Sequence, residues 1–243
     1  FYECRELANV EISPYSKLRS INTDSFSYSI INSIFIPPEV TIIDDGAFYQ
    51  CENLKIVDFS SDSKLQIIGK DAFRSSGLKK IVIPRYVTEI RESAFFTLPS
   101  LKEVIFHPES NLKIIGEFAF CKCDILNISI PSHVAKICDS AFCLCSNIKK
   151  VDFGPNSELR IIESNAFLSS SINEITIPSH VIEIGENAFS ECYCLQHFNF
   201  QNNSELKSIG KGAFSQSLIP NIIIPPHVSK ICENTFSNCN RLK

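Results

Sequence analysis

The sequence lacks several features that would place it in a common functional class. No apolar run reaches the roughly 18 residues that a membrane-spanning helix needs, so we expect no membrane span in this region. The 23 Lys and Arg residues do not outnumber the 27 Asp and Glu residues, which removes the usual electrostatic reason to bind nucleic acid or an anionic membrane surface. Methionine is absent and the chain begins at Phe1. We therefore expect a fragment of a longer chain, with no targeting signal visible in it.

The motifs of common enzymes and metal sites are missing as well. The sequence contains no Walker loop, no G-x-G-x-x-G, no H-E-x-x-H and no G-x-S-x-G. Eleven cysteines among 243 residues are too few for a disulfide-rich scaffold. Its C-x-C pairs have neither the C-x₂-C spacing nor the His partners of a zinc site. The sequence therefore predicts a protein that is not an enzyme and that holds no metal and no cofactor.

What the sequence has instead is an internal repeat. The dipeptide Ile-Pro recurs every 47 residues, at Ile36, Ile83, Ile130, Ile177 and Ile224. Phenylalanine recurs twice as often, at intervals that alternate between 25 and 22 residues, at Phe1, Phe26, Phe48, Phe73, Phe95, Phe120, Phe142, Phe167, Phe189, Phe214 and Phe236. Two unequal units therefore alternate along the whole chain.

Each unit has the apolar pattern of one coil of a solenoid. After each Phe the apolar residues follow L-x-x-L-x-L and alternate as in a short strand with one buried face. Before each Phe, an apolar pair and a small Ala indicate a tight turn or a short helix. One unit cannot bury these residues alone, so we expect the units to stack, with the Phe side chains forming a ladder through a shared core. Proline donates no ladder hydrogen bond, so each Ile-Pro is expected to end a strand.

The longer pattern I-P-x-x-V-x-x-I-x-x-x-A-F-x-x-C-x-x-L, as in IPSHVAKICDSAFCLCSNI from Ile130, resembles the BspA-like leucine-rich repeat family. The resemblance covers essentially all 243 residues; Leu98 in place of Cys and Thr235 in place of Ala are small departures. It implies an α/β fold, a right-handed β/α solenoid with a parallel concave sheet, as a single array over residues 1–243. It also implies a surface or secreted protein that attaches to host matrix proteins, host cells or other microbes.

The strand positions that point away from the core form one extended surface in a solenoid, and we take them as the candidate protein-binding face. The residues selected are Phe35, Ile56, Asp58, Lys80, Val82, Glu103, Ile105, Lys150, Asp152 and His197. Four of these, Phe35, Ile56, Val82 and Ile105, lie on consecutive rungs and predict an exposed apolar strip. The alternative is that flanking loops or a further domain cover the strip.

The cysteines and histidines also occupy repeated positions. Cysteine often stands three residues after Phe, which favours a small buried residue filling a narrow slot; disulfides between neighbouring rungs, Cys121–Cys143 and Cys123–Cys145, are the alternative. His133, His180 and His227 form a column that we expect to lie in exposed turns. These histidines are too widely spaced to share one metal ion. The alternative role for the column is weak pH sensing. Asn127 and Asn202 begin N-glycosylation sequons.

The sequence therefore predicts a non-catalytic solenoid whose concave face binds another protein. In line with the family resemblance, we expect a cell-surface or secreted adhesion protein whose ligand is a host extracellular-matrix or cell-surface protein. Two alternatives stay open: an intracellular scaffold that assembles cytosolic proteins with its cysteines reduced, and a structural spacer without a ligand. Disulfides or occupied sequons would favour the cell-surface or secreted adhesion protein over the intracellular scaffold. The identity of the ligand and the oligomeric state are not predicted.

Overall fold

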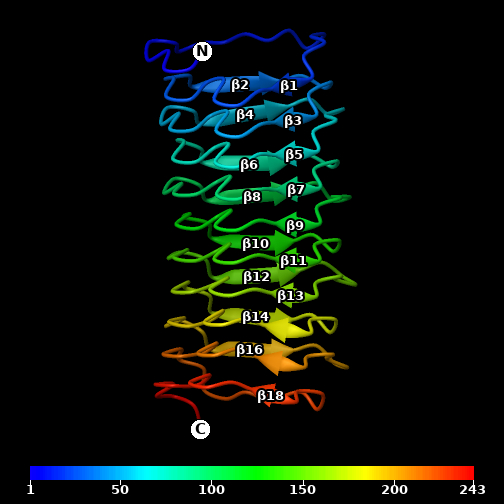
Figure 1. Ribbon diagram of the computed structural model, residues 1–243, viewed down its shortest axis with the longest axis vertical. Helices are drawn as coiled ribbons and strands as arrows, with labels where there is room; N and C mark the ends of the chain where they lie inside the picture. The colour runs from blue at the N-terminus through cyan, green and yellow to red at the C-terminus, as the bar shows by residue number, and fades with distance from the viewer.

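The computed structural model describes all 243 residues, and it is a stack of coils in which most coils contribute one short and one long strand to parallel sheets (Figure 1). The long strands have four residues and are β2 (Ser33–Ile36), β4 (Ile56–Phe59), β6 (Lys80–Ile83), β8 (Glu103–Phe106), β10 (Asn127–Ile130), β12 (Lys150–Phe153), β14 (Glu174–Ile177) and β16 (His197–Phe200). The short strands have two residues and are β1 (Ser20–Ile21), β3 (Ile42–Ile43), β5 (Ile67–Ile68), β7 (Glu89–Ile90), β9 (Ile114–Ile115), β11 (Lys136–Ile137), β13 (Ile161–Ile162), β15 (Glu183–Ile184), β17 (Ser208–Ile209) and β18 (Lys230–Ile231). The two termini lie at opposite ends of the stack.

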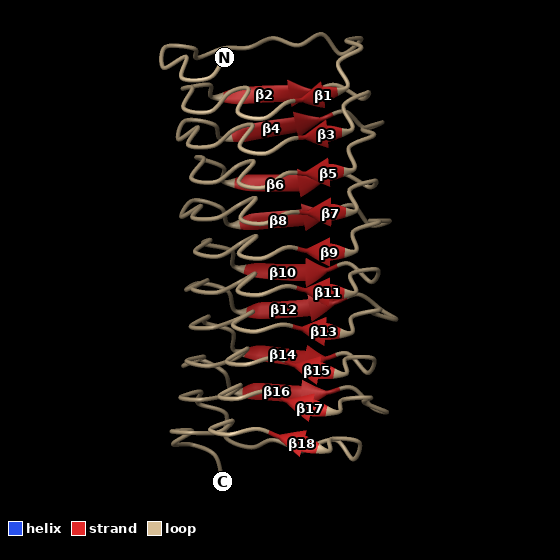
Figure 2. Ribbon diagram, viewed as in Figure 1, coloured by secondary structure: helices blue, strands red, loops and turns tan.

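The α/β class expected from the sequence is wrong, because the structure contains strands and turns but no helix (Figure 2). The residues two before and two after the anchoring Phe have left-handed backbone conformations, as at Ser140 (φ 55°) and Leu144 (φ 56°) around Phe142. A right-handed helix cannot continue through such residues. The Phe N–H donates to the next coil instead, as from Phe120 to the Ala141 carbonyl over 2.8 Å. The segment before each Phe is therefore a turn.

The register of the short strands advances in two alternating steps. Ser20 pairs with Ile42 and Ile42 pairs with Ile67, so that paired residues are 22 and then 25 positions apart. In the long strands the steps are more even: Lys80 pairs with Glu103, 23 positions on, and Glu103 with Asn127, 24 positions on. The difference in length between the 22-residue and 25-residue coils therefore lies mostly in the turns.

The long strands are hydrogen-bonded as doublets. Four residue pairs join β2 to β4, β6 to β8, β10 to β12 and β14 to β16. Only one pair joins β8 to β10, two join β12 to β14, and β4 and β6 are not paired. The result is one sheet of six long strands, β6 to β16, and a separate pair, β2 and β4.

Proline accounts for the doublets. Within a doublet, the residue after the second strand donates to the last carbonyl of the first, as from the Ser60 N–H to the Ile36 oxygen and from the His107 N–H to the Ile83 oxygen, each over 3.1 Å. At the next step the residue after the strand is proline, which has no N–H. Pro84 therefore cannot donate to the Phe59 carbonyl. Four of the five Ile-Pro dipeptides end a strand as expected, since β2, β6, β10 and β14 all end at the Ile; no strand ends at Ile224, before Pro225.

A phenylalanine ladder runs through the shared core, as predicted. The Phe side chains from Phe48 to Phe214 are fully buried. Neighbouring rings stack almost parallel; the centroids of Phe142 and Phe167 lie 5.3 Å apart and their planes differ by 4°. These rings belong to one continuous cluster of 60 buried residues. Each coil therefore depends on its neighbours for burial, as expected of a repeat array.

A second buried column lies three residues after each Phe, where Cys and Ser predominate. The Cys51 thiol donates to the carbonyl of Phe26 in the preceding coil over 3.0 Å, and Cys192 to that of Phe167 over 3.3 Å. Where Ser precedes Cys, the hydroxyl meets the thiol of the next coil, as between Ser170 and Cys192 at 3.4 Å. The small buried residue expected at this position is therefore also a hydrogen-bonding one.

Leu98 interrupts this column and leaves a neighbour without a partner. The next coil after Ser76 carries Leu98 in place of Cys, and the Ser76 hydroxyl is buried with no hydrogen bond. A buried unsatisfied hydroxyl costs about 1–3 kcal/mol. We expect Ser76→Ala to raise the free energy of unfolding by about 1 kcal/mol, measured by urea denaturation. The matched change Ser170→Ala, which removes a hydroxyl that has a partner, is expected to lower it; equal effects of the two changes would refute this account.

Candidate protein-binding face

The outward side chains of the long strands form a surface that we call the long-strand face. Its first column holds the first residue of each strand, namely Ser33, Ile56, Lys80, Glu103, Asn127, Lys150, Glu174 and His197. Its second column holds the third residue, namely Phe35, Asp58, Val82, Ile105, Ser129, Asp152, Thr176 and Asn199. All ten residues selected from the sequence lie in these two columns. Nine of them are exposed, and Phe35 is half-buried.

The apolar residues of this face do not form the single strip that the sequence suggested. Val82 and Ile105 are paired across a doublet and are 45% and 41% exposed. Ile56, 51% exposed, lies in the first column instead, opposite Ser33. The position next to Phe35 in the second column is Asp58. The exposed apolar surface therefore spans β4, β6 and β8, with Ile56 in the first column and Val82 and Ile105 in the second. The Asp58 carboxylate lies inside this surface.

Most charges on the long-strand face are paired. Lys80 and Glu103 form an ion pair across a doublet at 2.9 Å, and Lys150 pairs with Asp152 of its own strand at 2.9 Å. The hydrogen bond from Lys150 to Asp152 raises the lysine pKa. Each partner is about half exposed, and such surface pairs contribute little to stability. Asp58 and Glu174 have no ion-pair partner, and of these two uncompensated charges Asp58 lies among the apolar residues.

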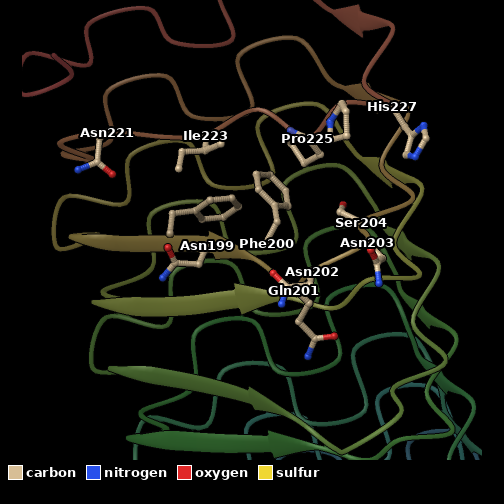
Figure 3. Close-up of a pocket in the computed structure, with 12 residues that line it drawn as sticks. Asn199, Phe200, Gln201, Asn202, Asn203, Ser204, Asn221, Ile223, Pro225 and His227 are labelled. Carbon is tan, nitrogen blue, oxygen red and sulfur yellow. The ribbon is translucent and has the colours of Figure 1, made fainter.

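Hollows open at the doublet boundaries, near the carboxyl ends of the long strands. One of about 610 Å³ lies between β4 and β6 and is lined by Phe59, Val82 and Pro84 among others. A second of about 420 Å³ lies beyond β16, where Phe200 faces Ile223 and Pro225 and the rim is polar (Figure 3). A smaller one of about 210 Å³ lies between β12 and β14. The sequence analysis missed these hollows, although the proline spacing was their signal.

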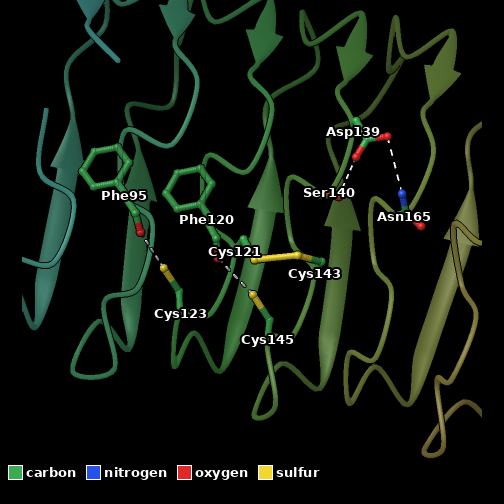
Figure 4. The surroundings of a disulfide bond; sticks show 9 residues. All are labelled: Phe95, Phe120, Cys121, Cys123, Asp139, Ser140, Cys143, Cys145 and Asn165. Carbon is green, nitrogen blue, oxygen red and sulfur yellow. Dashed lines mark hydrogen bonds between the residues drawn. A yellow bond between two sulfur atoms is a disulfide. The ribbon is translucent and has the colours of Figure 1, made fainter. Parts of the chain in front are cut away.

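One of the two disulfides considered from the sequence is present. Cys121 and Cys143, on adjacent coils with Cα atoms 4.8 Å apart, are bonded (Figure 4). Cys123 and Cys145 are not; each donates instead to a Phe carbonyl, of Phe95 over 3.0 Å and of Phe120 over 3.2 Å. Burial raises the pKa of Cys145 to about 12. This thiol is therefore held as a neutral donor and not as a nucleophile.

The three histidines lie in exposed turns, as predicted. Two of them meet a glutamate of the next coil: His133 lies 3.1 Å from Glu158, and His180 lies 2.8 Å from Glu205. The hydrogen bond with His180, helped by Arg160, lowers the Glu205 pKa.

No group of three or more metal-binding side chains is present. Both sequon asparagines, Asn127 in β10 and Asn202 in a turn, are exposed. The structure has no helix long and apolar enough to span a membrane.

Comparisons with known proteins place this geometry among bacterial repeat proteins. The family model described as BspA type leucine rich repeat region matches in six copies, over residues 1–102 and 113–243. A leucine-rich repeat protein from Bacteroides ovatus is 23% identical, with a TM-score of 0.69 over 100% of this chain and 67% of that one. The pneumococcal vaccine antigen PcpA is 21% identical, with a TM-score of 0.62 over 93% of this chain and 66% of that one.

A leucine-rich repeat protein of T. pallidum is 21% identical, with a TM-score of 0.51 over 81% of this chain and 79% of that one. No curated protein matches the chain. The chain thus spans about two thirds of the length of the Bacteroides and pneumococcal structures. At these identities the similarity to solved structures shows the fold alone.

Proposed function

Since this chain belongs to the BspA-type leucine-rich repeat family, we propose that it is a non-catalytic adhesion module, on the cell surface or secreted, that binds another protein through its long-strand face. The observation that carries the proposal is the exposed apolar surface of Ile56, Val82 and Ile105 on that face. Host extracellular-matrix or cell-surface proteins are the proposed ligands.

The composition of the long-strand face supports binding to a protein. Protein interfaces have a few apolar anchors at the centre and a polar, hydrated rim. Here the apolar residues of β4, β6 and β8 lie beside the Lys80–Glu103 ion pair. They are followed along the array by the polar residues of β10 to β16, among them the Lys150–Asp152 pair and His197. Since adjacent coils are hydrogen-bonded, the face is rigid, and little ordering entropy opposes association.

Two observations support a position outside the cell. The Cys121–Cys143 disulfide suits an oxidising compartment, because disulfides are rare in reducing ones. PcpA, which shares the fold, is described as a vaccine antigen. The alternative, an intracellular scaffold, requires this disulfide to be reduced. Antibody labelling of intact source cells, with permeabilised cells as control, distinguishes the two; labelling only after permeabilisation would contradict the surface location.

We expect the double change Ile56→Asp and Ile105→Asp to weaken ligand binding at least about tenfold, because each aspartate places a charge where an apolar contact is made. The measurement is surface plasmon resonance of the chain against a panel of purified extracellular-matrix and cell-surface proteins. Leu144→Asp is the matched control, since Leu144 is 44% exposed but lies beside the Phe142 turn, away from the long-strand face. If the double variant binds like the unaltered chain, the ligand lies elsewhere.

A further inference from the structure

The hollow between β4 and β6 differs from the other doublet boundaries, and we call it the β4/β6 hollow. It is the one boundary inside the array at which the long strands share no ladder pair. Since Pro84 has no N–H, the Phe59 carbonyl is left without the donor that the Ile36 carbonyl has in Ser60. A carbonyl acceptor and a gap in the sheet therefore occur at the same place.

The walls of the β4/β6 hollow are apolar. Phe59 is half-buried, Val82 is exposed, and Val57, Ile83 and Pro84 are buried beneath them. Tyr86 lines the hollow too, but the Arg85 guanidinium already lies over its ring, 5.5 Å from the centroid. A ligand group that enters this hollow must therefore have an apolar portion that packs against Phe59 and Val82.

The charges at the rim leave two carboxylates uncompensated. Lys64 and Arg85 line the hollow, but each is paired with a carboxylate outside it: Lys64 with Glu39 at 2.6 Å and Arg85 with Glu109 at 2.8 Å. The Nδ1 of His107 accepts the Glu109 N–H over 3.0 Å. Asp58 and Asp62 also line the hollow, and neither forms an ion pair. The free charged groups here are thus two carboxylates, with the Phe59 carbonyl as a further acceptor; the free donors, among them the His107 Nε2–H and the Ser61 hydroxyl, are neutral groups.

We propose that the β4/β6 hollow receives a lysine or arginine side chain of the protein partner. Both side chains combine an aliphatic stem with a cationic head that carries only donors. The stem packs against Phe59, Val82 and Pro84, and the head meets Asp58, Asp62 and the Phe59 carbonyl. The inference rests on the proposed function, because it specifies which residue type of the partner the long-strand face holds beside its apolar surface.

No other boundary offers the same combination. Asp152 occupies the position of Asp58 in β12, but its carboxylate is already paired with Lys150 at 2.9 Å. Glu174 also lines the hollow between β12 and β14 and forms no ion pair, but it is the single unpaired carboxylate there. Asn199 occupies that position in β16, beside the hollow of Figure 3, whose lining holds no carboxylate. Ile105 occupies it in β8. Of these hollows, the β4/β6 hollow is the one with two unpaired carboxylates, so we expect the strongest selectivity for a cation there, and the other boundaries provide matched controls within one chain.

The test is an NMR titration of the ¹⁵N-labelled chain with N-acetyl-L-lysine methylamide, with N-acetyl-L-norleucine methylamide as the probe that lacks the ammonium group. We expect lysine-dependent shifts of the Asp58–Lys64 and Val82–Tyr86 amides. The dissociation constant is expected to be at least about tenfold higher for norleucine, because norleucine lacks the ammonium group that hydrogen-bonds to the carboxylates. The double change Asp58→Asn and Asp62→Asn is expected to weaken lysine binding by a similar factor, and Asp152→Asn to leave it unchanged.

Three results would overturn the proposal: no saturable shift in the millimolar range, equal binding of norleucine, or unaltered lysine binding by the Asp58→Asn, Asp62→Asn variant. Its failure can be told apart from that of the proposed function. If the Asn variant keeps full affinity for the protein ligand while the Ile56→Asp, Ile105→Asp variant loses it, the hollow is not used but the long-strand face is. If both variants keep full affinity, the face itself is not the binding site.

Discussion

Replacing Phe142 with alanine is expected to lower the free energy of unfolding by about 3–5 kcal/mol. Phe142 is fully buried, with Phe120 stacked 5.4 Å away on one side and Phe167 5.3 Å away on the other. Truncation therefore removes two ring contacts and leaves a cavity in the middle of the stack, where regular backbone pairing limits any collapse. Urea denaturation followed by circular dichroism measures the effect.

The matched control is Leu144→Ala, two residues further on in the same turn. Leu144 is 44% exposed, so we expect its truncation to change the free energy of unfolding by less than about 0.5 kcal/mol. Hydrogen exchange should place the weakened region in the coils on either side of Phe142, because each coil contacts only its neighbours. A cost for Phe142→Ala as small as that for Leu144→Ala would show that the ladder is not the main source of stability.

The stacking and the family could be predicted from the sequence because both depend on the spacing of side chains. The Phe interval fixes where the ladder passes through each coil, and the proline after Ile36, Ile83, Ile130 and Ile177 fixes where strands end. Both predictions are confirmed, as is the BspA-type family. Spacing carries this information because a solenoid repeats one set of local contacts along the whole chain.

The absence of helix could not be read from the same pattern. An apolar pair followed by Ala-Phe suits a helical turn as well as a tight turn, and the two differ in backbone conformation, not in which residues are apolar. The left-handed residues include Ser140, Leu144 and Phe118. Residues of these types rarely adopt a left-handed conformation, so the sequence does not indicate it. Their conformations are held by hydrogen bonds to the next coil, so they depend on the stack.

The candidate site was predicted residue by residue but not in its arrangement. Alternation along each strand identified the outward residues, yet the apolar strip required knowing which of them face one another across the doublets. The strands β4 and β6 begin 24 positions apart, whereas Ile56 and Val82 are 26 positions apart. The two side chains are therefore offset by two residues and lie in different columns of the same face. The doublets themselves follow from the missing N–H of proline, which the sequence analysis used only to end strands.

Reduction of the Cys121–Cys143 disulfide is expected to lower the free energy of unfolding by about 3 kcal/mol, because the bond closes a loop between residues 22 positions apart in the unfolded chain. The native stack should change little, since both sulfurs are buried between coils that remain hydrogen-bonded through the Lys122 N–H and the Cys143 carbonyl at 2.9 Å. The effect is thus expected to lie mainly in the unfolded state.

Urea denaturation with and without a reducing agent measures this difference, and two variants decide its origin. Cys121→Ser with Cys143→Ser should match the reduced chain and show no response to reductant. Cys123→Ser should keep the full response, because the Cys123 thiol is unbonded and only donates to the Phe95 carbonyl. If the unaltered chain unfolds at the same urea concentration with and without the reducing agent, the disulfide does not restrain the unfolded chain. The disulfide would then no longer support a position in an oxidising compartment.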